Sequence, residues 1–440
     1  MQNYFYHLAD FVKAQLRGPE VFTAQFSSED SDFVRFNHAE IRQAGHVMHH
    51  SMSVDLINGR RHATGGTTLS GNQADDEQRL AALVADLREK YATLPEDPYL
   101  LYATDVQSTE RHGDNHLPDS TAAITEIQQA GRSHDLVGIY AAGGIHVGFA
   151  NAFGQRNWFS THSYNFDWSF HLAADKAIKS SYAGFDWDGP AFRRKVDWAG
   201  EQLAVLGQPA TTIQPGRYRV YLAPAALNDL VGILSWGGFG LKSHRTKQTP
   251  LLKMVEGDAR LHPSVSLLEN TRDGIAPNFQ EAGFLRPDQV RLIDGGAFRD
   301  CLVSPRSAKE YGVPTNGAGL AETPESVDLA AGTLPLATAL QQLDTGVYVG
   351  NLWYLNYSDR NACRTTGMTR FATFWVEHGV VQGPLNVMRF DETLYRALGE
   401  NLAALTSERE FILDPETYFG RSTRSGRIPG ALIEDFTFTL

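Results

Sequence analysis

Fifteen histidines give this 440-residue chain many candidates for metal binding, but few are spaced as a metal site requires. His46, His49 and His50 lie in one stretch predicted as a strand, where successive side chains point to opposite faces. His46 and His50 therefore share a face, and His49 points the other way. Two histidines supply only half of a tetrahedral zinc site, and no carboxylate is placed to complete it. The pattern favours a solvated strand face over a metal site.

The cysteines offer a second kind of chemistry. Only two occur, Cys301 and Cys363, which excludes a disulfide framework and a four-cysteine zinc site. Arg360 and Arg364 lie close to Cys363 along the chain, and neighbouring guanidinium groups can lower the pKa of a thiol. A reactive thiol at Cys363 is therefore one hypothesis, beside the simpler interpretation of a buried structural cysteine.

The familiar catalytic and nucleotide-binding motifs are missing from the sequence. Glycine-rich turns at 143–144 and 237–240 match neither a dinucleotide-binding fingerprint nor a P-loop with its lysine. There is no nucleophile elbow, no HExxH pair and no EF-hand loop. The formal charge of −12 argues against a surface that follows a nucleic-acid backbone. Residue types and spacing alone therefore reveal no convincing catalytic centre.

The elements that would position these residues indicate a mixed α/β protein. Its length suggests two or three domains, and a hydrophobic content of 42% is typical of folded soluble proteins. Alternating apolar and polar residues with a turn at Asn58-Gly59 predict an antiparallel meander near the N-terminus. Spacing of apolar residues and breakers predicts helices near 5–17, 75–92, 119–132 and 190–206.

Composition shifts and prolines divide the chain further. We predict an N-terminal α/β segment at 1–95, a linker at 96–120, a central α/β segment at 121–210 and a β-rich domain at 216–440. No run of eighteen apolar residues occurs, and the first residues lack the features of a secretory signal. We therefore expect a cytoplasmic protein with neither membrane nor nucleic acid as a partner.

Three segments resemble, in order along the chain, the TldD/TldE (PmbA) family. They are SDFVRFNHAEIRQAG (31–45), FQEAGFLRPDQVRLIDGGAFRDCLVSPRSAKEYGVPTNGAG (279–319) and YVGNLWYLNYSDRNACRTTGMTRFATFWVEHGVV (348–381). The resemblance implies an α/β N-terminal portion, a β-rich C-terminal domain and dimeric assembly, best known as a heterodimer of TldD and TldE. It also implies that TldD-type chains are zinc peptidases, with HExxxH on a helix and a cysteine near the C-terminus.

The same resemblance implies that this chain lacks those zinc-binding residues. The corresponding positions are Asn228 for the first histidine, Asp229 for the glutamate and Ile233 for the second histidine. The family cysteine corresponds to the region of Phe419, where no thiol occurs. The chain therefore resembles the TldE type, with no cofactor of its own and with zinc expected in a TldD-like partner. We expect residues 225–236 to form a helix that turns Asn228 and Ile233 toward a substrate chamber.

Three functions remain open at this point. The first is a non-catalytic subunit that pairs with a TldD-like zinc peptidase in the proteolysis of unfolded peptides. The second is a stand-alone homodimer that binds a peptide or small molecule without hydrolysis. The third is a hydrolase with a rebuilt site that uses Asp229, His244 or Cys363, although Lys242 and Arg245 beside His244 would repel a cation.

Overall fold

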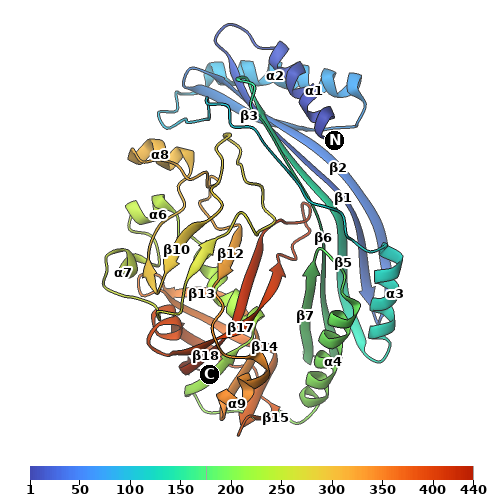
Figure 1. Ribbon diagram of the computed structural model, residues 1–440, viewed down its shortest axis with the longest axis vertical. Coiled ribbons are helices and arrows are strands. Elements are labelled where there is room, and N and C mark those ends of the chain that lie inside the picture. The colour runs from blue at the N-terminus through green and yellow to red at the C-terminus, as the bar shows by residue number, and fades with distance from the viewer. Residues whose placement is uncertain (175, 440) are drawn as a thin grey trace.

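The computed structural model describes residues 1–174 and 176–439, which form two β-rich halves with helices at their margins. Long strands of the N-terminal half curve along one side of the molecule, and the C-terminal half lies inside that curve (Figure 1). The predicted mixed α/β class, with a helix-and-antiparallel-sheet region followed by a β-rich domain, is confirmed.

The N-terminal half is built on one seven-stranded sheet. Its order is β3-β2-β1-β5-β6-β4, with β7 also pairing with β6. All pairs are antiparallel except β4 with β6. The segments predicted as 1–95 and 121–210 share this sheet, and the stretch 96–120 adds β4. The strands are β1 (Val21–Asn37), β2 (Glu40–Asn58), β3 (Arg61–Thr68), β4 (Thr109–His112), β5 (Asp135–Asn151), β6 (Arg156–Ala173) and β7 (Lys176–Gly184).

Four helices cover the two ends of this sheet. Helix α2 shows why they form: the Asn72 side chain accepts hydrogen bonds from Ala74 N and Asp75 N, and a buried apolar stripe recurs at helical spacing. All four agree with the predicted helices to within about three residues. They are α1 (Gln2–Ala14) and α2 (Gln73–Thr93) at one end, and α3 (Ser120–Gly131) and α4 (Gly189–Leu206) at the other.

An eleven-stranded sheet organises the C-terminal half. Strand β8 pairs with both β13 and β18, so that β18, β16, β14, β13 and β8 close into a ring. Its strands are β8 (Gly216–Leu222), β9 (Leu267–Glu269), β10 (Val290–Asp294), β11 (Ala297–Phe298), β12 (Ser326–Leu329), β13 (Gly346–Asp359), β14 (Arg364–Glu377), β15 (Val380–Pro384), β16 (Arg389–Thr393), β17 (Leu402–Leu413) and β18 (Ser425–Phe438).

Short helices connect these strands, and α5 packs against β13 and β18. Across the described residues, none of the helices has the length and apolar character needed to cross a membrane. The remaining helical segments are α5 (Pro224–Gly232), η1 (Ile233–Ser235), α6 (Leu241–Arg245), α7 (Leu252–Val255), α8 (Pro305–Tyr311), η2 (Leu336–Thr338), α9 (Ala339–Leu343) and η3 (Arg396–Glu400).

A shared core joins the two halves. Tyr140, Phe166 and Trp168 from the N-terminal sheet lie in the same buried cluster as Tyr348 and Phe374 from the C-terminal sheet. Because burial of large aromatic side chains dominates the energetics of such contacts, the halves are held as one packed body.

Candidate functional site

A cavity of about 700 Å³ lies between the two halves, which is the size of a small-molecule or peptide site. In Figure 1, α4 and β7 stand opposite β14 and β17 across this region. The N-terminal half contributes residues of β7 and α4 to its wall, and the C-terminal half contributes residues of β13, β14, β17, α9 and the start of α5.

The wall combines aromatic surface with charges of both signs. Trp198 is 46% exposed, which is unusual for so large an apolar side chain. Lys195 forms an ion pair with Glu410 across the cavity wall, from the N-terminal to the C-terminal half. The Nζ atom of Lys179 lies 3.4 Å from Oδ2 of Asp167. Such a wall can hold an apolar side chain and at the same time engage amides or charged termini of a ligand.

Strand β7 presents a backbone edge to this cavity. Within the part of the chain that the structure describes, β7 pairs only with β6. Lys179, Ser180 and Ser181 of β7 line the cavity. The unpaired N–H and C=O groups of an edge strand can bind an extended chain of almost any sequence.

Helix α5 and the turn that follows it carry Asn228, Asp229 and Ile233, the positions that the family resemblance assigns to the zinc site. The cavity-lining residues of α5 are Pro224 and Ala225, and neither Asn228 nor Ile233 is among the lining residues. A Cβ atom placed on Gly426 would lie 3.1 Å from Asn228 Oδ1, so Asn228 packs toward β18 instead. This arrangement differs from the expected one, in which Asn228 and Ile233 face the chamber.

The helix also ends earlier than expected. The family resemblance predicts one helix over residues 225–236, whereas α5 stops at Gly232 and a tighter 3₁₀ turn begins at Ile233. The side chain of Ile233 is 3% exposed, and its carbonyl accepts a 2.9 Å hydrogen bond from Tyr357 Oη. A buried hydrocarbon chain therefore stands where the family resemblance would place the second histidine.

Asp229 is the one residue of this set whose side chain is a typical zinc ligand. Its Oδ2 accepts a hydrogen bond from Leu352 N at 3.2 Å. Burial raises the pKa of Asp229 to about 7, and the Leu352 N–H and the charge of Lys179 offset this only in part. A lone carboxyl beside an amide and an isoleucine does not provide the donors that a zinc ion needs, so these residues do not fit the metal.

Phe419 lies in the loop between β17 and β18. It is 93% exposed, and the chain just after it lies against the N-terminal sheet, where Arg421 N donates to Glu29 Oε2 at 3.0 Å. This loop and α5 therefore contact different parts of the molecule. Across residues 1–174 and 176–439, no three histidine, cysteine or acidic side chains are grouped as a metal site would require.

Of the two other candidates, Cys363 is buried and His244 is partly buried. Burial raises the pKa of Cys363 to about 12, and the charge of Arg360 offsets this only in part. Of the two interpretations of Cys363, the structure therefore favours the buried structural cysteine over the reactive thiol, because desolvation outweighs the nearby charge. Burial also lowers the pKa of His244, whose Nε2 lies 2.8 Å from the Gly238 carbonyl.

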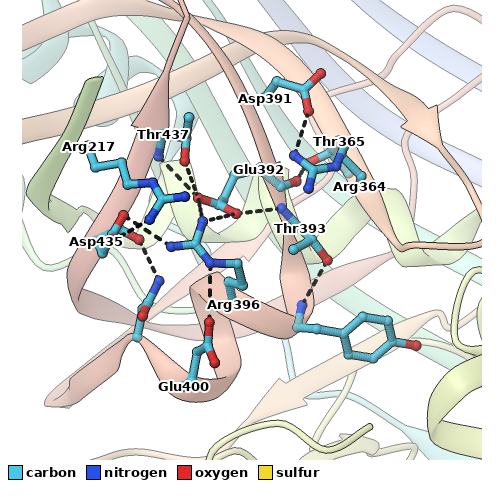
Figure 2. Close-up of polar contacts among 12 residues, drawn as sticks. Arg217, Arg364, Thr365, Asp391, Glu392, Thr393, Arg396, Glu400, Asp435 and Thr437 are labelled. Carbon is cyan, nitrogen blue, oxygen red and sulfur yellow. Dashed lines mark hydrogen bonds and ion pairs between the residues drawn. The ribbon is translucent and has the colours of Figure 1, made fainter. Parts of the chain in front are cut away.

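Sequence reasoning missed the cavity residues, including Lys195, Trp198 and Glu410. Lys195 and Trp198 lie on α4, whereas Glu410 lies on β17, 215 residues beyond Lys195, and the three belong to no motif, so no sequence signal marked them. It also missed a buried polar cluster around Glu392, which Figure 2 shows with Arg396 and Thr437. Glu392 accepts from Arg396 Nη1 at 3.1 and 3.2 Å and from Thr437 Oγ1 at 2.8 Å. Its partners are satisfied within the cluster, so we interpret it as structural.

Comparison with known proteins shows which family shares this architecture. Residues 215–440, just over half of the chain, match the family described as the PmbA/TldA metallopeptidase C-terminal domain. The chain belongs to the TldD/TldE (PmbA) family. Comparison of the TldD/TldE-family chain with curated protein sequences gives no significant match.

Solved structures share the fold of this TldD/TldE-family member over nearly its whole length. TldE from Thermococcus kodakarensis is 14% identical, with a TM-score of 0.77 over 99% of this chain and 100% of that one. A proposed modulator of a DNA gyrase from Thermotoga maritima is 12% identical, with a TM-score of 0.77 over 99% of both chains. Another from Bacteroides thetaiotaomicron is 15% identical, with a TM-score of 0.72 over 99% and 98%.

Proposed function

We propose that this chain is a TldE-like, non-catalytic subunit of a TldD/TldE-type metallopeptidase complex that degrades unfolded peptides. The observation that carries the proposal is the set of side chains on α5 and at the residue that follows it. Asn228, Asp229 and Ile233 stand where the family resemblance places the peptidase residues, and they offer one carboxyl of raised pKa, an amide and a buried hydrocarbon chain. Zinc and its activated water would then belong to a TldD-like partner in the cytoplasm.

The contribution of this chain would be to hold the peptide. The β7 edge beside the cavity offers main-chain hydrogen bonds, which accept many sequences. Trp198 and the Lys195–Glu410 pair supply apolar and charged contacts along the same wall. Folded proteins lack a free extended segment and would be excluded.

Peptide capture can be tested apart from hydrolysis. Ala225 lines the cavity at the start of α5, so Ala225→Trp would fill part of the space. Ala85→Trp on the exposed face of α2 is the matched control. We expect a fluorescent unstructured peptide to bind the wild type and the control equally and to bind Ala225→Trp at least about tenfold more weakly. Equal binding by all three proteins would contradict a role for the cavity.

The catalytic assignment needs a second experiment, in which this chain is omitted from a complex reconstituted with a TldD-like subunit. Loss of peptidase activity supports the proposal, and unchanged activity contradicts it. Similar structures are described as proposed modulators of DNA gyrase. The charge of −12 gives no support for contact with DNA, so an effect on gyrase would be indirect, through proteolysis of another protein.

A stand-alone homodimeric binding protein is the second candidate. The cavity favours it, because aromatic walls, paired charges and a free edge can hold a peptide or small molecule without any metal. A neighbouring gene that encodes an HExxxH protein would distinguish the two candidates in favour of the peptidase complex, and an isolated gene would favour the binding protein.

A further inference from the structure

Two bulges interrupt the pairing of β13 with β14 near the cavity. The register shifts at residues 349–351 of β13 and again at residues 353–356. Phe371 lies at the first bulge with a φ of 61°, and Tyr354 lies at the second with a φ of 59°. These left-handed values favour glycine and are rare for large aromatic side chains. Backbone strain of this kind is concentrated at binding sites, where a bulge changes the direction in which a side chain points.

The strands at these bulges bring an arginine and two aromatic rings together. The guanidinium carbon of Arg370 lies 4.7 Å from the ring centre of Trp353 and 5.5 Å from that of Phe371. We call these three residues the arginine clamp. Contact with aromatic faces holds the planar guanidinium in one orientation, so little freedom is lost when it forms hydrogen bonds to a ligand. The clamp is therefore organised for binding before any ligand arrives.

The arginine clamp adjoins the cavity. Asn351, which lies directly opposite Arg370 in the register of β13 with β14, is one of the residues that line the cavity. Ala372, the neighbour of Phe371 in β14, is another. Directly opposed residues of an antiparallel pair point to the same face of a sheet, so Arg370 leaves the sheet on the side of the cavity. A chain that leaves the cavity at Asn351 would reach the clamp within about two residues.

The charge of Arg370 has no partner within the protein. Among residues 1–174 and 176–439, its guanidinium forms neither an ion pair nor a hydrogen bond. Three other cations of the cavity wall each form an ion pair with an acidic side chain of the protein: Lys179, Lys195 and Arg409. Arg194 also lines the cavity, but it is exposed, and no aromatic ring of the described residues lies over its guanidinium. Arg370 is thus both oriented and available to an anionic group from outside.

We propose that the arginine clamp binds a carboxylate of the peptide held in the cavity, either the C-terminal carboxylate or the side chain of an aspartate or glutamate. This inference rests on the proposed function and names the class of peptide that the cavity selects. Arg370 donates two parallel hydrogen bonds to the carboxylate. Trp353 and Tyr354, which are 46% and 76% exposed with ring centres 5.5 Å apart, pack against the apolar part of the same peptide residue.

Fluorescence polarisation with the purified full-length chain tests this assignment, using three unstructured peptides that differ in one group. The first has a free C-terminal carboxylate and no acidic side chain. The second is its C-terminal amide, and the third is the amide with one internal glutamine replaced by glutamate. At low salt we expect at least one carboxylate peptide to bind about tenfold or more tightly than the amide, and the peptide that gains affinity identifies the source of the carboxylate. Equal binding of all three would overturn the proposal.

Variants of the arginine clamp locate the preference. Arg370→Gln should abolish the preference for carboxylate and leave the affinity for the amide unchanged, whereas Arg370→Lys keeps the charge without the planar group and should retain only part of it. Arg42→Gln removes the same charge from an exposed position on β2 and should behave as the wild type. Trp353→Ala changes a half-exposed side chain and should weaken the preference about threefold or more, which gives the same test if Arg370→Gln does not fold. A preference that persists in the Arg370→Gln or Trp353→Ala variant would overturn the proposal.

The same measurements separate this inference from the proposed function. If the wild type binds all three peptides equally and Ala225→Trp weakens their binding, the cavity holds peptide and the arginine clamp does not select it. If the wild type binds none of the three peptides, both the cavity's role and the clamp's role are overturned. Preference for carboxylate that depends on Arg370, together with weaker binding of every peptide by Ala225→Trp, supports both.

Discussion

Replacement of Asp229 by asparagine should stabilise this protein at alkaline pH. The pKa of Asp229 is about 7 in the folded chain, against an ordinary value of 3.8. The folded state therefore retains the proton between about pH 4 and pH 7, whereas the unfolded state loses it. The free energy of unfolding falls as pH rises through this window, and the loss is complete above pH 7.

The size of the effect follows from the shift. About three pKa units at about 1.4 kcal/mol each give an upper limit of roughly 4 kcal/mol. Because Asp229 is only partly buried, we expect about 2–4 kcal/mol. Asparagine keeps an oxygen that can accept the hydrogen bond from Leu352 N but cannot ionise. The variant should therefore be more stable than the wild type at pH 8 and nearly equal to it at pH 4.

Urea unfolding of Asp229→Asn and the wild type at both pH values measures this difference. Glu269, whose pKa burial also raises to about 7, is present in both proteins and cancels in the comparison. Asp105→Asn, in an exposed loop, is the control and should leave the pH dependence unchanged. A lower stability of Asp229→Asn at pH 8 would refute the reasoning. So would zinc that stabilises the wild type but not the variant, since Asp229 would then act as a ligand.

Two polar anchors give further predictions. The guanidinium of Arg421 donates hydrogen bonds to the carbonyl and the hydroxyl of Ser163, both at 2.7 Å. Arg421→Met should therefore lower the free energy of unfolding by about 2–4 kcal/mol and speed proteolysis of the 414–424 loop. Proteolysis of the variant at the wild-type rate would contradict this. Glu392→Ala should lower the free energy of unfolding by about 3–5 kcal/mol, measured by urea or thermal unfolding, because Arg396 and Thr437 lose a buried partner. Glu400→Ala removes the exposed partner of Arg396 and should lower the free energy of unfolding by less than about 1 kcal/mol. If Glu392→Ala and Glu400→Ala destabilise the protein equally, the buried cluster does not contribute as we infer.

Much of the N-terminal half could be predicted because its signals are local. Helix α2 has an asparagine cap and a regular apolar stripe, and the turn at Asn58-Gly59 marks the β2–β3 hairpin. Each of these features lies within about twenty residues of sequence. Periodicity and turn chemistry therefore suffice to place them.

The closed ring and the cavity could not be predicted in this way. β8 and β18 lie near opposite ends of the C-terminal half, and no local pattern indicates that they pair. The cavity depends on how α4 and β7 meet β17, which is a matter of tertiary packing. The candidate site shows the same limit. Arg360 beside Cys363 suggested a reactive thiol, but the pKa is governed by burial, which the sequence does not report.

Native mass spectrometry of the tagged chain, purified from its own host at natural expression, tests the central claim most directly, because one spectrum reports both partner mass and bound metal. We predict equal numbers of this chain and a TldD-like chain, with one zinc ion for each copy of the partner and none for this chain. An assembly of this chain alone that carries zinc would contradict the account, since the metal would then be held by residues that we find unsuited to it.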